Sequence, residues 1–277
     1  MSKLFKAGVV SVAAGLTFGS LPVLTNVAHA DSKTVTVGVV GTSDNDLWKV
    51  VAKTAKKKYG ITIKTKVFTD YTQPNQAVAS GSIDLNAFQH VYFLDNWNAS
   101  NKNSVVSIGK TIIAPIRLYS TTRKSVKDFK KGDKIVIPND ATNEGRALTL
   151  LQTAGLIKLN PKAKLPTPKD ITSNKLNLKI TAVDASQTPS ALKSSDGAVI
   201  NNTYSEDAKI SNKESIYTEP VNKASSQWIN LIAAKKSQKN NKVYREVVKA
   251  YQTQATKNYI KKTYGKSEVA AWDIKLK

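Results

Sequence analysis

Cysteine is absent from all 277 residues of the chain. Its absence excludes disulfide bonds, a thiol nucleophile, cysteine ligands to a metal and a lipid carried on an N-terminal cysteine. Histidine is almost absent too, because only His29 and His90 occur. A serine–histidine–aspartate triad would have to use His90, and no G-x-S-x-G motif accompanies it. Hydrolysis by a serine or cysteine nucleophile therefore has no support in the sequence.

Motifs of several other enzyme and cofactor-binding classes are also missing. The segments "GKT" (109–111) and "GKS" (265–267) lack the earlier glycine that a phosphate-binding loop requires. No H-E-x-x-H motif, EF-hand loop or dinucleotide fingerprint occurs, and the acidic residues are scattered rather than paired. We therefore predict that the protein is not an enzyme and has no catalytic residue, metal site or cofactor.

Acidic residues are few beside the basic ones. The chain has 42 lysines and arginines against 20 aspartates and glutamates, which gives a net charge of +22. Most of these cations are lysines, which make diffuse contacts rather than bidentate ones. No nucleic-acid-binding motif occurs, so we predict no nucleic-acid partner. Two interpretations of the charge remain, a solvated surface and adhesion to anionic polymers of the cell envelope.

Long apolar runs are confined to the first thirty residues. This segment carries Lys3 and Lys6, then an apolar stretch, then "AHA" ending at Ala30. The pattern is typical of a secretory signal peptide cleaved after Ala30. Cleavage leaves 247 residues with a net charge of +20. We therefore expect a secreted protein, extracellular or associated with the cell envelope, without a lipid anchor.

The rest of the chain alternates between the strand and helix periodicities. Residues 34–40 alternate as a strand, and residues 47–59 follow helical spacing up to Gly60. Similar pairs follow, and the apolar stripe from Tyr244 to Tyr259 predicts the longest helix. Such alternation predicts an α/β fold with mainly parallel sheets flanked by helices.

The length of the chain suits two lobes of ordinary size. Extended crossings are expected near "IIAPIRLYS" and "SSQWINLIAA". Residues 31–114 and 222–277 are then predicted to form lobe 1, and residues 115–221 lobe 2, after the signal peptide of residues 1–30. This arrangement places both ends of the mature chain in one lobe.

Four polar clusters fall at strand ends or helix starts. They are "FTDYTQPN" (68–75), "NAFQHVYFL" (86–94), "PNDATNEGR" (138–146) and "INNTY" (200–204). Ligands of open parallel sheets bind outside the carboxyl ends of the strands, where helix N-termini point. The sequence therefore predicts that a ligand site is formed from these clusters.

Arg146 is one of only 4 arginines beside 38 lysines. Asn143 is expected to cap the following helix, which places Arg146 in the first turn, where backbone N–H groups attract an anion. A guanidinium there adds a bidentate partner for a carboxylate. The alternative is a structural salt bridge from Arg146 to Glu144 or Asp140.

Aromatic side chains concentrate in the first two clusters. They are Tyr71, Phe88, Tyr92 and Phe93, with His90 among them. Rings with polar tips suit an apolar side chain or a thioether. Alternatively, Phe88 and Phe93 belong to the core and His90 makes only a local hydrogen bond. Asn201 and Asn202 either turn the chain or present an amide to an ammonium or carboxylate group.

The motifs themselves resemble a known family. The segments "FTDYTQPNQAVASGSIDLNAFQH", "IPNDATNEGRALTLLQTAGLIKL", "AVINNTY" and "INLIAAK" closely resemble the NlpA-type family. Its members are methionine-binding components of ABC importers. The resemblance runs in order over nearly all of residues 34–272, and the segment around Arg146 is highly specific.

The resemblance implies a two-lobed, type II-like periplasmic-binding-protein fold, and we predict that the protein is a monomer. Such a protein closes on L-methionine, a related amino acid or a methionyl dipeptide and delivers it to an ABC permease. By motif position, Arg146 would hold the α-carboxylate, and Asn143 and Asn201 the head group. The side-chain pocket would include Tyr71, His90 and Phe93. Further lining residues would be Phe88, Tyr92, Asn202 and Asn230.

The chain departs from the family pattern in two places. Members usually carry a lipobox cysteine, which is missing here. Where the family often reads F-Q-H-x-P-Y-L, this chain reads "FQHVYFL", so Tyr92 replaces a proline and Phe93 a pocket tyrosine. The leading hypothesis is a secreted methionine carrier. The alternative is a cationic cell-surface interaction or adhesion protein retained on anionic envelope polymers.

Overall fold

A six-stranded sheet forms the first of two lobes in the computed structural model, which describes residues 33–276. Its strand order is β13-β4-β12-β3-β1-β2. The strands are β1 Thr34–Val40, β2 Thr62–Phe68, β3 Leu85–Asn86, β4 Val105–Ile113, β12 Ile229–Lys235 and β13 Val269–Ala270. Strand β1 runs parallel to β2 and β3, whereas β12 and β13 pair antiparallel with their neighbours.

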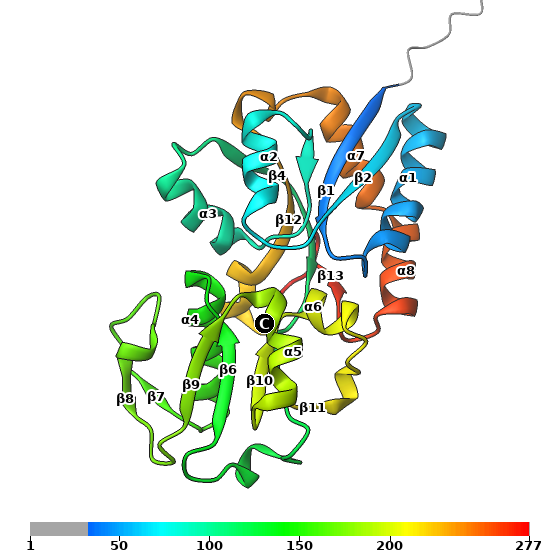
Figure 1. Ribbon diagram of the computed structural model, residues 1–277. Helices are drawn as coiled ribbons and strands as arrows, with labels where there is room; N and C mark the ends of the chain where they lie inside the picture. The colour runs from blue at the N-terminus through cyan, green and yellow to red at the C-terminus, as the bar shows by residue number, and fades with distance from the viewer. Residues whose placement is uncertain (1–32, 277) are drawn as a thin grey trace, which may run out of the picture. The chain divides into compact units, whose positions relative to one another are not determined.

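Helices cover both faces of this sheet (Figure 1). They are α1 Asn45–Tyr59, α2 Gln73–Ser80, α3 Val91–Ser100, α7 Lys242–Tyr251 and α8 Gln254–Thr263. The alternating valines of β1 separate two cores. Val35, Val37 and Val39 pack in one cluster with residues of α1, α7 and α8. Val40 packs in the other with residues of α2 and α3.

A five-stranded sheet forms the second lobe, in the order β11-β5-β10-β6-β9. Its strands are β5 Arg117–Tyr119, β6 Lys134–Pro138, β9 Lys179–Val183, β10 Gly197–Ile200 and β11 Ser215–Thr218. The helices of this lobe are α4 Ala141–Thr153, α5 Thr188–Ala191 and α6 Asn202–Asp207, and β7 Lys158–Leu159 pairs with β8 Ile171–Ser173. Strands β6, β9 and β10 are parallel to one another, and β5 pairs antiparallel with β10 on one side and with β11 on the other.

Short 3-10 helices complete the fold. They are η1 Val126–Asp128, η2 Pro168–Asp170, η3 Ala185–Gln187, η4 Leu192–Ser194, η5 Asn212–Glu214, η6 Lys223–Trp228 and η7 Lys236–Gln238. Two stretches connect the sheets, residues 114–116 between β4 and β5, and residues 219–228 between β11 and β12. The lobe limits predicted from the sequence stay a prediction.

The two-lobed α/β architecture is the one expected, with two local differences. Both sheets contain more antiparallel pairing than predicted, because the chain reverses direction where β5 and β12 enter. The single long helix predicted over residues 244–259 is wrong. It is two helices, because the side chain of Thr253 accepts a hydrogen bond from the N–H of Thr256 and starts α8 afresh. The longest helix described is α1.

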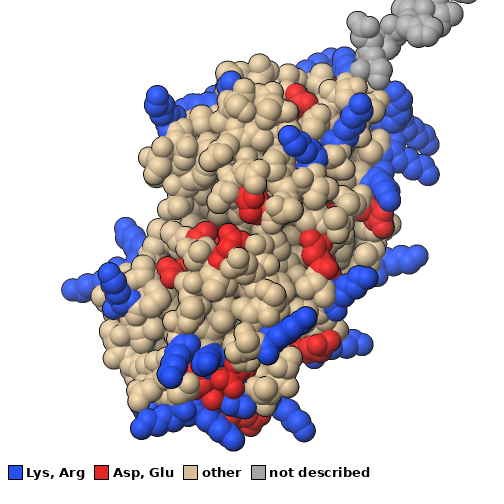
Figure 2. Space-filling model, viewed as in Figure 1, with Lys and Arg blue, Asp and Glu red and all other residues tan. Residues whose placement is uncertain are grey.

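The predicted signal peptide lies outside the described residues. Among residues 33–276, no helix has the length and apolar character needed to cross a membrane. Figure 2 shows Lys and Arg side chains projecting mainly from the periphery of the visible face, while several acidic side chains lie near its middle. The positive charge is therefore spread over the outer surface rather than gathered in one groove on this face.

Candidate functional site

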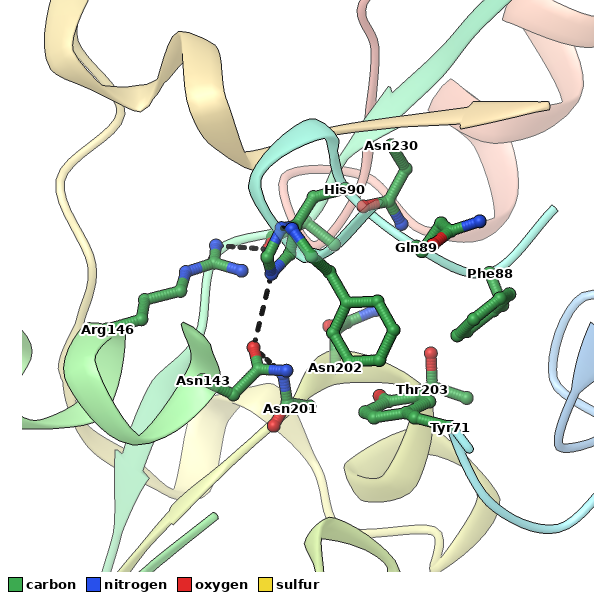
Figure 3. Close-up of a pocket in the computed structure, with 12 residues that line it drawn as sticks. Tyr71, Phe88, Gln89, His90, Asn143, Arg146, Asn201, Asn202, Thr203 and Asn230 are labelled. Carbon is green, nitrogen blue, oxygen red and sulfur yellow. Dashed lines mark hydrogen bonds between the residues drawn. The ribbon is translucent and has the colours of Figure 1, made fainter. Parts of the chain in front are cut away.

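A cavity lies between the two lobes (Figure 3). Its lining residues are Tyr71, Phe88, Gln89, His90, Phe93, Ala114, Asn143, Arg146, Asn201, Asn202, Thr203 and Asn230. They come from all four polar clusters, from the first crossing at Ala114 and from strand β12 at Asn230. The fold thus brings nine of the ten sequence-predicted site residues together.

The N-terminus of α4 supplies the polar end of the cavity. Asp140, not Asn143, is the N-cap, because its carboxylate accepts a hydrogen bond of 3.1 Å from the backbone N–H of Asn143. The Asn143 amide also donates to both oxygens of Asp140, at 3.0 Å each. This turns Oδ1 of Asn143 outward, where it accepts 2.9 Å from Nδ2 of Asn201. The predicted cap was wrong by three residues, and Asn143 is oriented by the true one.

Arg146 lies in the second turn of α4 and is only 4% exposed. Its Nε donates to Oε1 of Glu219 at 2.8 Å, and its Nη2 donates to Oε2 of Glu219 at 2.5 Å. Nη2 also donates to the carbonyl of Ala114 at 3.0 Å. The guanidinium carbon lies 4.6 Å from the ring centroid of Trp228. The alternative reading of a structural salt bridge is therefore correct in kind, but its partner is Glu219 rather than Glu144 or Asp140.

One guanidinium nitrogen of Arg146 is left for a ligand. Within residues 33–276, Nη1 has no hydrogen-bond partner, and Figure 3 shows the guanidinium directed toward His90 and Asn143. A salt bridge and a ligand contact are thus compatible in one side chain. The Glu219 pair fixes the fork, and the remaining nitrogen faces the cavity.

His90 connects the two lobes across the cavity. It caps α3, because Nδ1 accepts 3.0 Å from the backbone N–H of Phe93. Its Nε2 lies 3.4 Å from Oδ1 of Asn143. An accepting Nδ1 requires the proton on Nε2, so Nε2 donates to Asn143. Burial, reinforced by the charge of Arg146, lowers the pKa of His90 to about 3. The imidazole is therefore neutral, and it makes both the local bond and the cross-lobe bond.

Aromatic rings form the other end of the cavity. The Tyr71 centroid lies 5.7 Å from that of Phe88 and 6.0 Å from that of Phe93, and Phe88 and Phe93 are 5.6 Å apart. Tyr204 extends the wall, 5.0 Å from Tyr71. Phe88 and Phe93 are half-buried and line the cavity, and Phe88 also packs against the core that contains Val40. Burial raises the pKa of Tyr71 well above its ordinary value, which keeps the phenol neutral.

Asn201 and Asn202 have different surroundings. Oδ1 of Asn201 is buried without a hydrogen-bond partner in the described chain. Asn202 accepts 2.9 Å from Arg117 and donates to Glu268 at 2.9 Å and to Glu206 at 3.1 Å. Asn201 therefore keeps hydrogen-bonding capacity, whereas Asn202 is held by its own network at the edge of the cavity.

Tyr92 is the predicted lining residue that lies elsewhere. Its hydroxyl donates to the carbonyl of Lys164 at 3.2 Å, and its ring centroid is 5.7 Å from that of Trp228. It lines a neighbouring cavity on the far side of Arg146 and Trp228. Tyr92 thus gives this chain a hydrogen bond between the lobes.

Three lining residues were not predicted. Gln89 exchanges hydrogen bonds of 2.8 and 2.6 Å with the buried Asn75, which anchors the loop before His90. Thr203 follows Asn202, and Ala114 begins the first crossing. The quoted clusters contain Gln89 and Thr203, so a polar side chain beside a chosen one was the available signal. Ala114 contributes through its backbone carbonyl, for which its residue type gives no signal.

A cavity enclosed by two α/β lobes, with amides and a guanidinium at one end and aromatic rings at the other, defines a two-lobed solute-binding protein. The model of the NlpA lipoprotein family matches residues 35–272, and the chain belongs to that family. The resemblance read from the motifs is thereby confirmed.

Relatives with similar sequences cover nearly the same length. The D-methionine-binding lipoprotein MetQ of Escherichia coli is 35% identical over 265 residues, covering 94% of this chain and 97% of that protein. The probable D-methionine-binding lipoprotein MetQ of Haemophilus influenzae is 36% identical over 241 residues, covering 86% and 87%.

Solved structures agree with the fold. A nutrient binding protein from Burkholderia cenocepacia bound to methionine is 42% identical, with a TM-score of 0.82, and the match covers 86% of this chain and 99% of that one. The substrate binding protein of a methionine transporter from Streptococcus pneumoniae is 42% identical with a TM-score of 0.82, covering 86% and 96%. Such relatives are substrate-binding proteins, and the predicted two-lobed fold is confirmed.

Proposed function

We propose that this protein is the substrate-binding component of an ABC importer and that it binds L-methionine, a related amino acid or a methionyl dipeptide. The observation that carries the proposal is the cavity with two unlike ends. Nη1 of Arg146 and the amides of Asn143 and Asn201 lie at the polar end. The Asn201 amide donates a hydrogen bond of 2.9 Å to Oδ1 of Asn143. Tyr71, Phe88 and Phe93 form the apolar end.

Each end suits one part of methionine. A carboxylate fits the remaining guanidinium nitrogen, and the buried, unpaired Oδ1 of Asn201 supplies an acceptor for an ammonium. A thioether packs well against ring edges. The relatives named above as methionine-binding support this assignment.

Binding would proceed by closure of the lobes. The lining residues come from both lobes, so a ligand that touches both favours the closed state. A membrane permease would then recognise the closed form. The role is that of a carrier rather than an enzyme, and we propose that the protein acts as a monomer.

Calorimetric titration of ligand-free protein tests the proposal. The panel contains L-methionine, D-methionine, a methionyl dipeptide, leucine and glutamate. We expect the methionine-containing ligands to bind and glutamate not to bind, because an anionic side chain would lie against aromatic rings. Failure of every methionine-containing ligand to bind would refute the proposal.

Retention of the protein at the cell surface is proposed to be electrostatic. The chain has no cysteine for a lipid, a net charge of +22, and cationic side chains that project from the periphery (Figure 2). Exposed charges separated from their partners by more than about 8 Å are screened at physiological salt, so retention by charge weakens as salt rises. Washing cells with increasing salt should therefore release the protein. Retention in high salt would contradict the proposal.

A further inference from the structure

Glu219 lies where three parts of the molecule meet. It stands at the start of the crossing from β11 to β12, and its carboxylate accepts two hydrogen bonds from Arg146 of α4. The same carboxylate accepts 3.2 Å from the N–H of Ile116 in the other crossing. The backbone N–H of Glu219 donates 3.0 Å to the carbonyl of Ile116. One carboxylate therefore ties both crossings to the side chain that faces the ligand.

This arrangement determines which part of the guanidinium is available. The Glu219 side chain is 12% exposed and that of Arg146 is 4% exposed. With Nε and Nη2 engaged, a carboxylate ligand reaches only Nη1, and a second bidentate pair cannot form. Glu219 thus acts on the ligand through the position of Arg146.

Charge is balanced by the same pair. Arg146 is the only lysine or arginine among the residues that line the cavity, and Glu219 neutralises it within hydrogen-bond distance. His90 is neutral, and the other polar lining groups are amides and hydroxyls. Asp140, behind Asn143, brings no positive charge to the polar end. A ligand with a carboxylate alone would therefore bring an uncompensated charge into a buried site, which is costly.

We infer that Glu219 is a positioning residue that makes the polar end select a zwitterion over an anion of the same shape. The inference rests on the proposed function, since it assumes an amino-acid ligand, and it names the feature of the head group that is recognised. A zwitterion adds no net charge to the balanced Arg146–Glu219 pair. An anion adds one negative charge.

Two ligands with the same side chain separate these cases. L-methionine carries an ammonium and a carboxylate, and 2-hydroxy-4-(methylthio)butanoate carries a hydroxyl and a carboxylate. We expect the native protein to bind methionine at least about 30-fold more tightly, because specificity of this kind follows the unpaired charge left by the wrong ligand. In Glu219→Gln, the unneutralised Arg146 favours the anion, and the preference should shrink by about tenfold or more.

Two variants serve as controls. Glu219→Asp keeps the charge and should keep most of the native preference for methionine, even if the shorter side chain lowers the affinity for both ligands. Asp133→Asn removes the acid from another bidentate pair of this lobe, in which Arg123 donates two bonds of 2.8 Å, and neither residue lines the cavity. Its ratio of affinities should equal the native ratio.

The outcomes are distinct. An unchanged ratio in folded Glu219→Gln, with both ligands weakened equally, would overturn the inference and leave Glu219 a structural residue. Equal binding of the two ligands by the native protein would overturn it without any variant, which covers the case of a variant that does not fold. Absence of methionine binding to the native protein would instead refute the proposed function.

Discussion

Two sets of contacts join the lobes, and the pKa values of their ionisable side chains are shifted differently. The first lies in the cavity, where Arg146 is paired with Glu219 and His90 is neutral with a pKa of about 3. We call the second set the acidic clasp. In it, Asp207 accepts hydrogen bonds from Thr42 and Ser43, and Asn202 donates to Glu206 and Glu268. Asp44 lies close enough to Glu206 to influence its pKa and belongs to the same set. Burial raises the pKa of Glu206 to about 7 and that of Asp44 to about 6.

This difference in pKa indicates that ligand recognition and lobe closure depend on different residues. Burial lowers the pKa of His90 and raises that of Tyr71, so both side chains stay neutral across the physiological pH range and their part in ligand recognition is constant. The clasp contains carboxyls that titrate within that range, and Oε2 of Glu268 is buried without a partner in the described chain. We therefore expect the ligand to be selected by the cavity and the ease of lobe opening to depend on the clasp.

Loss of the cavity guanidinium should have the largest effect. Arg146→Ala should weaken methionine binding by about 100-fold or more, because truncating one partner of a buried charge pair typically costs 2–5 kcal/mol. Calorimetry measures the affinity. The variant should also melt earlier, since Glu219 is left buried without its cation, and Arg146→Ala/Glu219→Gln should recover part of that loss. Unchanged affinity in Arg146→Ala would remove this residue from the site.

The sequence predicted the cavity better than the clasp, for physical reasons. The cavity residues lie at strand ends and helix starts, where a parallel sheet directs ligands, and the motifs of the family include them. Asp207, Glu206 and Glu268 are ordinary acids on a short helix and a terminal segment, and nothing in their spacing indicates that they meet. The partner of Arg146 was missed for the same reason, because Glu219 is 73 residues away and joins it only when both crossings fold.

Local structure was predictable where one residue decides it. Gly60 ends α1 with φ of 69°, as its place after the apolar stripe indicates. The break between α7 and α8 was not predicted, because Tyr244, Val248 and Tyr251 keep helical spacing up to it and only the cap at Thr253 interrupts the backbone. Periodicity reports which face is buried and does not report where one helix stops and another continues the same face.

Disruption of the clasp should weaken binding, although neither Gly41 nor Asp207 lines the cavity. A Cβ on Gly41 would lie 2.0 Å from Oδ2 of Asp207 and 3.1 Å from Thr203, so Gly41→Ala displaces the carboxylate from the N–H groups of Thr42 and Ser43. The closed state then loses stability, and we expect methionine affinity to fall by about tenfold, since binding is reduced by the fraction of protein able to close.

Gly60→Ala is the matched control for Gly41→Ala. Both glycines have positive φ, 71° and 69°, so both variants carry similar backbone strain. A Cβ on Gly60 meets nothing within 4 Å. Calorimetry and thermal unfolding of both variants separate strain from clasp loss. Equal affinities in the two variants would show that the clasp does not influence closure.

The pH dependence of stability should come from the clasp. The folded pKa of Glu206 is raised to about 7 by burial, so its contribution to stability is full below its unfolded value near 4.5 and is lost as pH rises through 7. Burial also raises the pKa of Asp44, so its contribution to stability is likewise lost as pH rises. The native protein should therefore melt at a lower temperature at pH 8 than at pH 5. Glu206→Gln should reduce the difference in unfolding free energy between the two pH values by about 2 kcal/mol. This corresponds to a few degrees of melting temperature.

An exposed acid provides the comparison for Glu206→Gln. Asp95 lies on the solvent side of α3. Asp95→Asn should leave the pH dependence of the melting temperature at its native value. A native protein equally stable at pH 5 and pH 8 would contradict the assignment of titrating carboxyls to the clasp.

The smallest effect is expected at the aromatic end of the cavity, which has ring contacts in place of directed hydrogen bonds. Phe93 lies edge-on to Tyr71 and Phe88, with centroid separations of 6.0 and 5.6 Å. Phe93→Tyr restores the tyrosine of the family pattern and keeps the ring. We expect methionine affinity to change by less than about threefold, since a half-buried ring at the cavity edge can direct a new hydroxyl to solvent. Calorimetry against methionine and the methionyl dipeptide measures it. A tenfold change for either ligand would show that the aromatic end also recognises the ligand by a directed hydrogen bond. The contrast drawn between the polar and aromatic ends of the cavity would then be wrong.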